Sequence, residues 1–184
     1  MTTDWIDRTA AQTRTVFVSA GHSDTDSGAA ANGITEADIV LELRDLVCEQ
    51  LEGRIKFSRD GAEFVNMSLS SATKMAAASD IAVEFHCNAA TPAATGVETL
   101  SKREDFALAS KFLKATVDAL GLRNRGAKPE NAGQHSRLAF VSDGGGIILE
   151  LFFLTNTGDI EAYQQNRNAL AAALADVLVE EACR

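Results

Sequence analysis

Short apolar, β-branched segments alternate along this chain with longer stretches of helical periodicity. The clearest apolar segments are residues 15–19, 81–86 and 147–151 (TVFVS, IAVEFH and IILEL). Segments of this length and composition are typical of strands that are buried on both faces. Strands joined by helices pair in parallel, because the helix carries the chain back to the same edge of the sheet. The pattern predicts an α/β fold: a single-domain sandwich of a twisted, mainly parallel sheet flanked by helices.

Other segments continue the alternation. Thr35 is the expected N-cap of a first helix that Gly53 ends, with Asp38 as its weak capping-box partner. Further helices are predicted at residues 69–79, 106–120 and 169–179, and further strands at residues 54–58, 97–100 and 138–141. In such sheets, binding sites lie beyond the carboxyl ends of the strands. Polar side chains at those ends are therefore the first candidates for function.

Composition narrows the classes of partner. The 184 residues include 17 Lys and Arg against 26 Asp and Glu, a net charge of −9. This balance argues against binding to nucleic acid and to anionic membranes, which both favour clustered cations. No apolar run is long enough to insert into a membrane, and we expect a monomer. The three cysteines show no CxxC spacing, which suits a reducing compartment and no disulfide framework.

Two of the three histidines lie at predicted strand ends. His22 follows the strand at residues 15–19, and His86 closes the strand at residues 81–86. Glu36 falls in the first turn of the first helix, from where it can face the end of the first strand. Two imidazoles and one carboxylate are a ligand set that catalytic zinc sites use. Glu150 lies inside the apolar run IILELFF, where burial raises the pKa of a carboxyl toward the range useful for proton transfer.

Several alternatives stay open at these positions. Asp24 and Asp26 lie close enough in sequence to compete with Glu36 as the carboxylate ligand. His135 is either a solvated loop residue or an alternative ligand. Asn88, two residues after His86, either supports a ligand or the substrate or forms a turn at the strand end.

Taken in order, several segments resemble the zinc-dependent N-acetylmuramoyl-L-alanine amidases of the Amidase_3 type. They are VFVSAGH, GITEADIVLELRDLV, FSRDG, SDIAVEFHCNAA, GVETLS, RNRGAK and ILELFFLTNTGDIEAY. The resemblance implies one zinc-binding α/β domain that hydrolyses the amide between the lactyl group of N-acetylmuramic acid and L-alanine in peptidoglycan. It places His22, Glu36 and His86 on the family's metal ligands and Glu150 on its catalytic glutamate. Residues 15–184 would form this catalytic domain, after a polar extension at residues 1–14.

The chain departs from the family pattern in places. The family's Asp-Pro-Gly-His-Gly opening is replaced by SAGHS at residues 19–23, and Glu84 and Phe85 replace the usual Ser and Ile. An arginine that the family often has in the helix before this strand is missing, and Lys74 is the nearest cation. These departures bear on substrate detail, because all four chemical residues are retained.

Two other functions remain open from the sequence. One is a non-catalytic wall-binding or structural component, and the other is a zinc peptidase that cuts within the stem peptide. The N-terminal segment MTTDWIDRTAAQTRT lacks the basic start and apolar stretch of a secretory signal. We therefore expect a protein that is made in the cytoplasm and acts on the cell wall after release, as a phage lysin or a particle-borne enzyme does.

Overall fold

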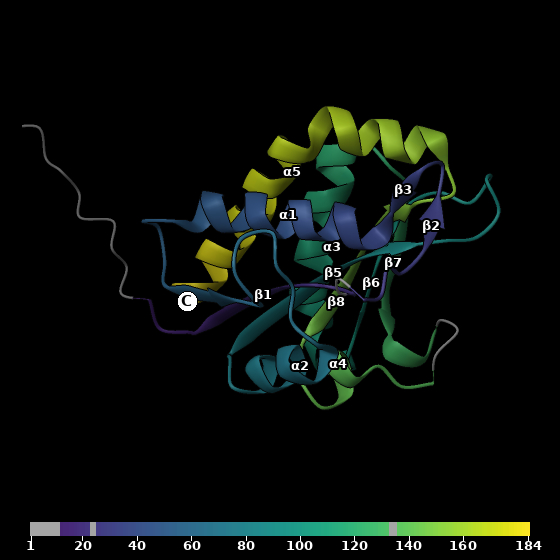
Figure 1. Ribbon diagram of the computed structural model, residues 1–184. Helices are drawn as coiled ribbons and strands as arrows, with labels where there is room; N and C mark the ends of the chain where they lie inside the picture. The colour runs from purple at the N-terminus through teal and green to yellow at the C-terminus, as the bar shows by residue number, and fades with distance from the viewer. Residues whose placement is uncertain (1–11, 23–24, 133–135) are drawn as a thin grey trace, which may run out of the picture.

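The computed structural model describes residues 12–22, 25–132 and 136–184, and its centre is a six-stranded sheet (Figure 1). The strand order is β4-β1-β5-β8-β6-β7, and only the pairing of β6 with β8 is antiparallel. The strands are β1 (Val16–Ala20), β4 (Phe57–Arg59), β5 (Ile81–Asn88), β6 (Val97–Ser101), β7 (Asn124–Pro129) and β8 (Ile147–Phe153). The predicted α/β fold with a mainly parallel sheet is confirmed.

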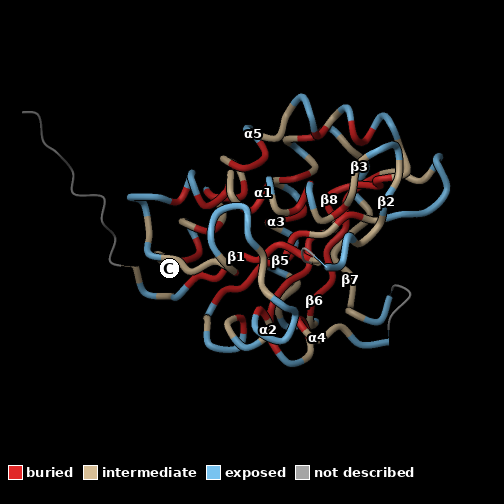
Figure 2. The backbone as a smooth tube through the Cα atoms, in the orientation of Figure 1, coloured by how far each residue is buried: buried red, intermediate tan, exposed pale blue. Residues whose placement is uncertain are grey.

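Helices cover both faces of the sheet. The larger layer contains α1 (Glu36–Leu51), α3 (Phe106–Leu120) and α5 (Thr157–Ala182), and the smaller one contains α2 (Leu69–Ala77) and α4 (Ala139–Ser142). Alternate side chains of β1 enter different cores, because successive strand residues point to opposite faces. Val16 and Val18 pack under the larger layer, whereas Phe17 packs with Phe140 under the smaller one. Figure 2 shows buried backbone concentrated in these central strands.

The first helix begins where its capping residue predicts. The side chain of Thr35 accepts a hydrogen bond from the Asp38 amide at 3.2 Å, and its hydroxyl donates to the Asp38 carboxylate at 2.6 Å. A two-stranded hairpin, β2 (Ala30–Ala31) with β3 (Ile34–Thr35), leads directly into this helix. Glu36 is therefore the first helical residue, held between the hairpin that precedes it and the capped first turn of α1.

Several predicted elements differ from the observed ones. The predicted strand at residues 138–141 is wrong, because this apolar segment forms the short helix α4. Strand β7 and the β2–β3 hairpin were not expected, and the closing helix is much longer than predicted. The second strand lies later than residues 54–58, at Phe57–Arg59. Two short 3-10 helices, Arg103–Asp105 and Glu130–Ala132, complete the described secondary structure.

Only residues 12–14 of the expected N-terminal extension are described. The Thr13 and Arg14 amides donate to the Ala182 carbonyl, which ties this segment to the end of α5. Within the described part of the chain, no helix combines the length and apolarity that a membrane span requires.

Candidate metal centre and its cavity

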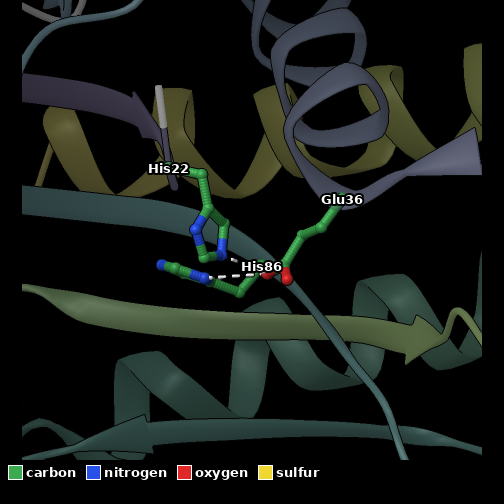
Figure 3. Close-up of side chains that lie close together, drawn as sticks. All are labelled: His22, Glu36 and His86. Carbon is green, nitrogen blue, oxygen red and sulfur yellow. Dashed lines mark hydrogen bonds and ion pairs between the residues drawn. The ribbon is translucent and has the colours of Figure 1, made fainter. Parts of the chain in front are cut away.

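Three side chains from three separate elements converge beyond the carboxyl end of β1. His22 lies just after β1, Glu36 begins α1 and His86 lies near the end of β5. Figure 3 shows the three side chains pointing toward one another. One potential ligand atom from each residue lies within 4.8 Å of those of the other two. The structure thus brings together the three residues that the sequence predicts as a ligand set.

Glu36 is at the centre of this cluster. Its Oε1 atom lies 3.0 Å from His22 Nε2 and 3.0 Å from His86 Nδ1, and it also accepts the Cys87 amide at 2.9 Å. The Ala29 amide donates to Oε2 at 3.0 Å. Burial by itself raises the pKa of Glu36, but the hydrogen bonds from both imidazoles and from the Cys87 amide hold that pKa well below its usual range. The group is therefore an anion that faces two imidazoles.

The backbone around His22 is held in an unusual conformation. His22 has a φ of 65°, in the left-handed region that few residues other than glycine adopt. The side-chain amide of Asn66 donates to the carbonyls of Ala20, Gly21 and His22 at 2.9, 3.2 and 2.6 Å. These bonds fix the loop that presents the imidazole. No feature of the sequence indicates that Asn66 reaches this loop.

Gly21 provides the space that the second imidazole occupies. A Cβ atom at this position would lie 2.3 Å from His86 Cε1. Real Cβ atoms do not approach other atoms so closely, and the His86 side chain is only 19% exposed. The glycine before His22 is therefore required by the packing of His86, rather than by its own backbone angles.

His86 is held at both of its ring nitrogens. Its Nδ1 faces Glu36, and its Nε2 lies 3.0 Å from Glu84 Oε1. Glu84 is only 3% exposed, and its second oxygen accepts the Ser19 hydroxyl at 3.0 Å. Burial lowers the pKa of His86, but the hydrogen bonds to Glu36 and Glu84 outweigh it and raise that pKa well above its ordinary value. The sequence showed Glu84 as a departure from the family pattern, without indicating this contact.

Glu150 lies next to His86 in the sheet. The two residues are register partners on the parallel strands β5 and β8, so their side chains share one face. Glu150 is at the middle of β8, because this strand runs on to Phe153 rather than ending at the predicted residue 151. Its buried Oε2 atom has no hydrogen-bond partner among the described residues. Burial raises the pKa of Glu150 to about 7.

All four residues line one cavity of about 750 Å³. Two imidazole nitrogens and a carboxylate oxygen are donors that zinc prefers, and a set of three leaves room for a further ligand. The unpartnered Glu150 oxygen lines the same cavity, so a proton-transfer group is available beside the ligand set. The residues present therefore fit a catalytic zinc ion.

The other candidates of the sequence fall in different places. Asp26 is exposed, and its carboxylate contacts His22 Nδ1 at 3.2 Å, the ring nitrogen that faces away from Glu36. Asn88 lines the cavity and donates to Glu98 Oε1 at 3.3 Å. Asp24 and His135 lie outside the described residues. Of the two candidate carboxylates that the structure describes, Glu36 and Asp26, Glu36 is the one found between both imidazoles.

Comparison with known proteins gives a consistent family. A family model described as N-acetylmuramoyl-L-alanine amidase matches residues 16–180. The protein YqiI of Bacillus subtilis (strain 168) is 32% identical over 165 residues, which cover 83% of this chain and 78% of YqiI. The endolysin of Bacillus phage SPP1 is 35% identical over 126 residues, which cover 61% of this chain and 46% of the endolysin.

A solved structure agrees in fold and in sequence. The crystal structure of the putative N-acetylmuramoyl-L-alanine amidase from Neisseria meningitidis superposes with a TM-score of 0.85 at 37% identity. The match covers 93% of this chain and 97% of the Neisseria chain. The likeness therefore extends over nearly all of both molecules.

Proposed function

The chain belongs to the family of N-acetylmuramoyl-L-alanine amidases, and from this premise we propose that it cleaves peptidoglycan with a zinc ion held by His22, Glu36 and His86. The bond cleaved joins N-acetylmuramic acid to L-alanine, which frees the stem peptide from the glycan strand. The observation that carries the zinc proposal is the convergence of these three side chains in one cavity beside Glu150.

Zinc, when bound, supplies a Lewis acid that polarises the scissile carbonyl and lowers the pKa of the attacking water. Glu36 and the two imidazoles would hold the ion at the edge of the cavity that they line. Glu36 is suited to this task because its pKa is held low, so it stays ionised over the working range of pH.

Glu150 is the proposed proton-transfer group. Its unpartnered Oε2 atom accepts a proton from the attacking water and then donates it to the departing nitrogen of L-alanine. A pKa of about 7 keeps the protonated and ionised forms close in free energy, so both transfers are accessible near neutral pH. Burial of the Glu150 carboxyl among the apolar side chains of β8 is the main reason that its pKa is raised to this value.

Asn88 is proposed to help position the substrate. Its amide nitrogen donates to Glu98, which leaves the amide oxygen available to accept a hydrogen bond from the peptide. Asn88 lines the cavity on the same strand as His86, so it is placed to contact a peptide that enters beside the ligand set.

Zinc content tests the ligand assignment. We expect the purified protein to retain stoichiometric zinc after dialysis and Glu36→Gln to lose it, because an amide oxygen is a much poorer zinc ligand than a carboxylate. Asp26→Asn and His135→Gln are matched controls, since each removes a rival ligand that the sequence left open. Loss of zinc from either control, with retention by Glu36→Gln, would overturn the assignment.

We also propose that the protein reaches the cell wall after release from the cytoplasm. The similarity to the SPP1 endolysin supports this route. Co-expression with a membrane-pore protein should convert a culture that tolerates the enzyme into one that lyses. Lysis that does not depend on the pore would contradict the proposal.

A further inference from the structure

One wall of the cavity carries two cations, and we refer to Arg125 and Lys128 of β7 as the cationic wall. Arg125 Nε and Lys128 Nζ each lie 2.6 Å from the same oxygen, Oε2 of Glu98. Among the described residues that line the cavity, they are the only lysine and arginine. The remaining charged groups there are carboxylates or the imidazoles of the metal cluster. The lysine and arginine side chains of the cavity are thus confined to strand β7.

The cationic wall carries more positive charge than Glu98 neutralises. Burial alone raises the pKa of Glu98, but Lys128 and Arg125 outweigh it and keep the pKa below its usual value, so Glu98 is an anion. One carboxylate therefore faces two cations. The side chains of Arg125 and Lys128 are 29% and 30% exposed, whereas that of Glu98 is 10% exposed. The unbalanced charge is accessible from the cavity.

Arg125 has a free edge. Its guanidinium lies 4.8 Å from the centre of the Phe153 ring, and its Nε is used by Glu98. Its two terminal nitrogens have no hydrogen-bond partner among the described residues. A guanidinium held in this way presents parallel N–H groups that match the two oxygens of a carboxylate. Lys128 uses one contact and retains further donors.

The cationic wall is within reach of the scissile bond. Glu150 and Glu98 are register partners on neighbouring strands, and β7 is the next strand beyond β6. Neighbouring strands are about 4.8 Å apart, so the wall lies roughly 5–10 Å from Glu150 because both cations reach back to Glu98. An extended peptide covers about 3.3–3.6 Å per residue. A group two to three residues along the stem peptide therefore arrives at the wall.

We propose that Arg125 and Lys128 form a subsite for a free carboxylate of the stem peptide, carried by the second residue after the scissile bond. The enzyme then prefers wall peptides in which this α-carboxylate is free over those in which it is amidated. The inference rests on the proposed function, since the carboxylate belongs to the peptide that the amidase releases.

The test compares two soluble substrates. They are N-acetylmuramoyl tripeptides that differ only in an α-carboxylate or an α-carboxamide at the second residue. We expect kcat/KM to be about 10- to 100-fold higher for the carboxylate form, the range of a charge-assisted hydrogen bond lost from a desolvated site. Arg125→Gln and Lys128→Met should each lower kcat/KM more for the carboxylate form than for the carboxamide form, so that the ratio between the two substrates falls toward one.

Two further variants make the result specific. Arg123→Gln removes an exposed arginine just before β7 and should keep the full preference. Arg125→Lys keeps the positive charge but lacks the parallel N–H donors. It should therefore show part of the preference for the carboxylate substrate that Arg125→Gln loses. Variants that lose activity on both substrates equally would show that the cations serve only to neutralise Glu98, and would overturn the proposal.

The wild-type enzyme separates this inference from the function on which it rests. Equal cleavage of both substrates would refute the carboxylate subsite and leave the amidase intact. Cleavage of neither substrate, by an enzyme loaded with zinc, would count against the proposed function itself.

Discussion

Replacing Glu150 with glutamine should lower activity and raise stability in the same protein. The substitution keeps the shape of the side chain and removes its charge and its basic oxygen. Glu150 is not among the three residues around the candidate zinc position, so zinc content should be unchanged. Loss of a group that transfers protons typically lowers rates by about 10²- to 10⁴-fold. We expect a fall of that size in the release of new amino termini from purified peptidoglycan.

The gain in stability follows from the pKa of Glu150. Burial raises this pKa from 4.5 to about 7, so the fold favours the protonated form. Below pH 4.5 the group is protonated in both the folded and the unfolded chain and has no effect. Between pH 4.5 and 7 only the unfolded chain ionises, so stability falls as pH rises. Above pH 7 the full penalty of about 3 kcal/mol is present.

The assay for this penalty is urea denaturation of zinc-free protein at several pH values. The free energy of unfolding of Glu150→Gln should equal that of the wild type near pH 4 and exceed it by about 3 kcal/mol at pH 8. Glu63→Gln, at an exposed site, is the control and should show no such trend. A difference that is the same at both pH values, or a variant with wild-type activity, would refute the reasoning.

Two further substitutions test the second imidazole. Glu84→Gln should weaken zinc affinity by about 10- to 100-fold, because the Glu84 carboxylate contacts Nε2 of His86 and orients the ring. Competition with a chromophoric chelator measures this affinity. An unaltered affinity would mean that the contact does not orient the ring. Gly21→Ala should retain a folded circular-dichroism spectrum but lose zinc, because the added Cβ would lie 2.3 Å from the His86 imidazole. Full zinc binding by this variant would show that His86 is not placed as described.

The parts of the fold that could be predicted are those with a strong local pattern. The apolar runs of β1, β5 and β8 are strands in the structure because they are buried on both faces. Parallel strand ends meet at one edge of the sheet, so residues far apart in sequence could be expected to converge there. This is why His22 and His86 could be grouped from the sequence, and Glu36 joins them because it lies in the first turn of the helix that follows β1.

The parts that could not be predicted depend on tertiary contacts. Residues 138–141 are apolar, and a run so short has no periodicity that separates strand from helix. The edge strand β7 contains a glycine and a proline and is only partly buried, so it lacks a strand pattern. Glu36 was the predicted carboxylate ligand, but the sequence left Asp26 as a rival, because what separates the two is the position of Glu36 between both imidazoles.

The contacts around the ligand residues could not be predicted either, because they too depend on tertiary structure. Glu84 contacts His86 because residues two apart on a strand point to the same face. The Ser19 hydroxyl, on the neighbouring strand, donates to the other oxygen of Glu84. The cationic wall depends on the pairing of β6 with β7, which places Arg125 and Lys128 around Glu98. Neither arrangement leaves a signal in the order of residues along the chain.

The central claim is tested most directly by mass spectrometry of purified peptidoglycan digested with wild-type enzyme, before and after exhaustive chelation and after zinc is returned. We expect intact stem peptides that begin with L-alanine, their disappearance on chelation and their recovery with zinc. Peptides cut internally would identify a peptidase, and binding without any release would identify a non-catalytic wall protein. Unchanged release of stem peptides after complete removal of the metal would contradict the account.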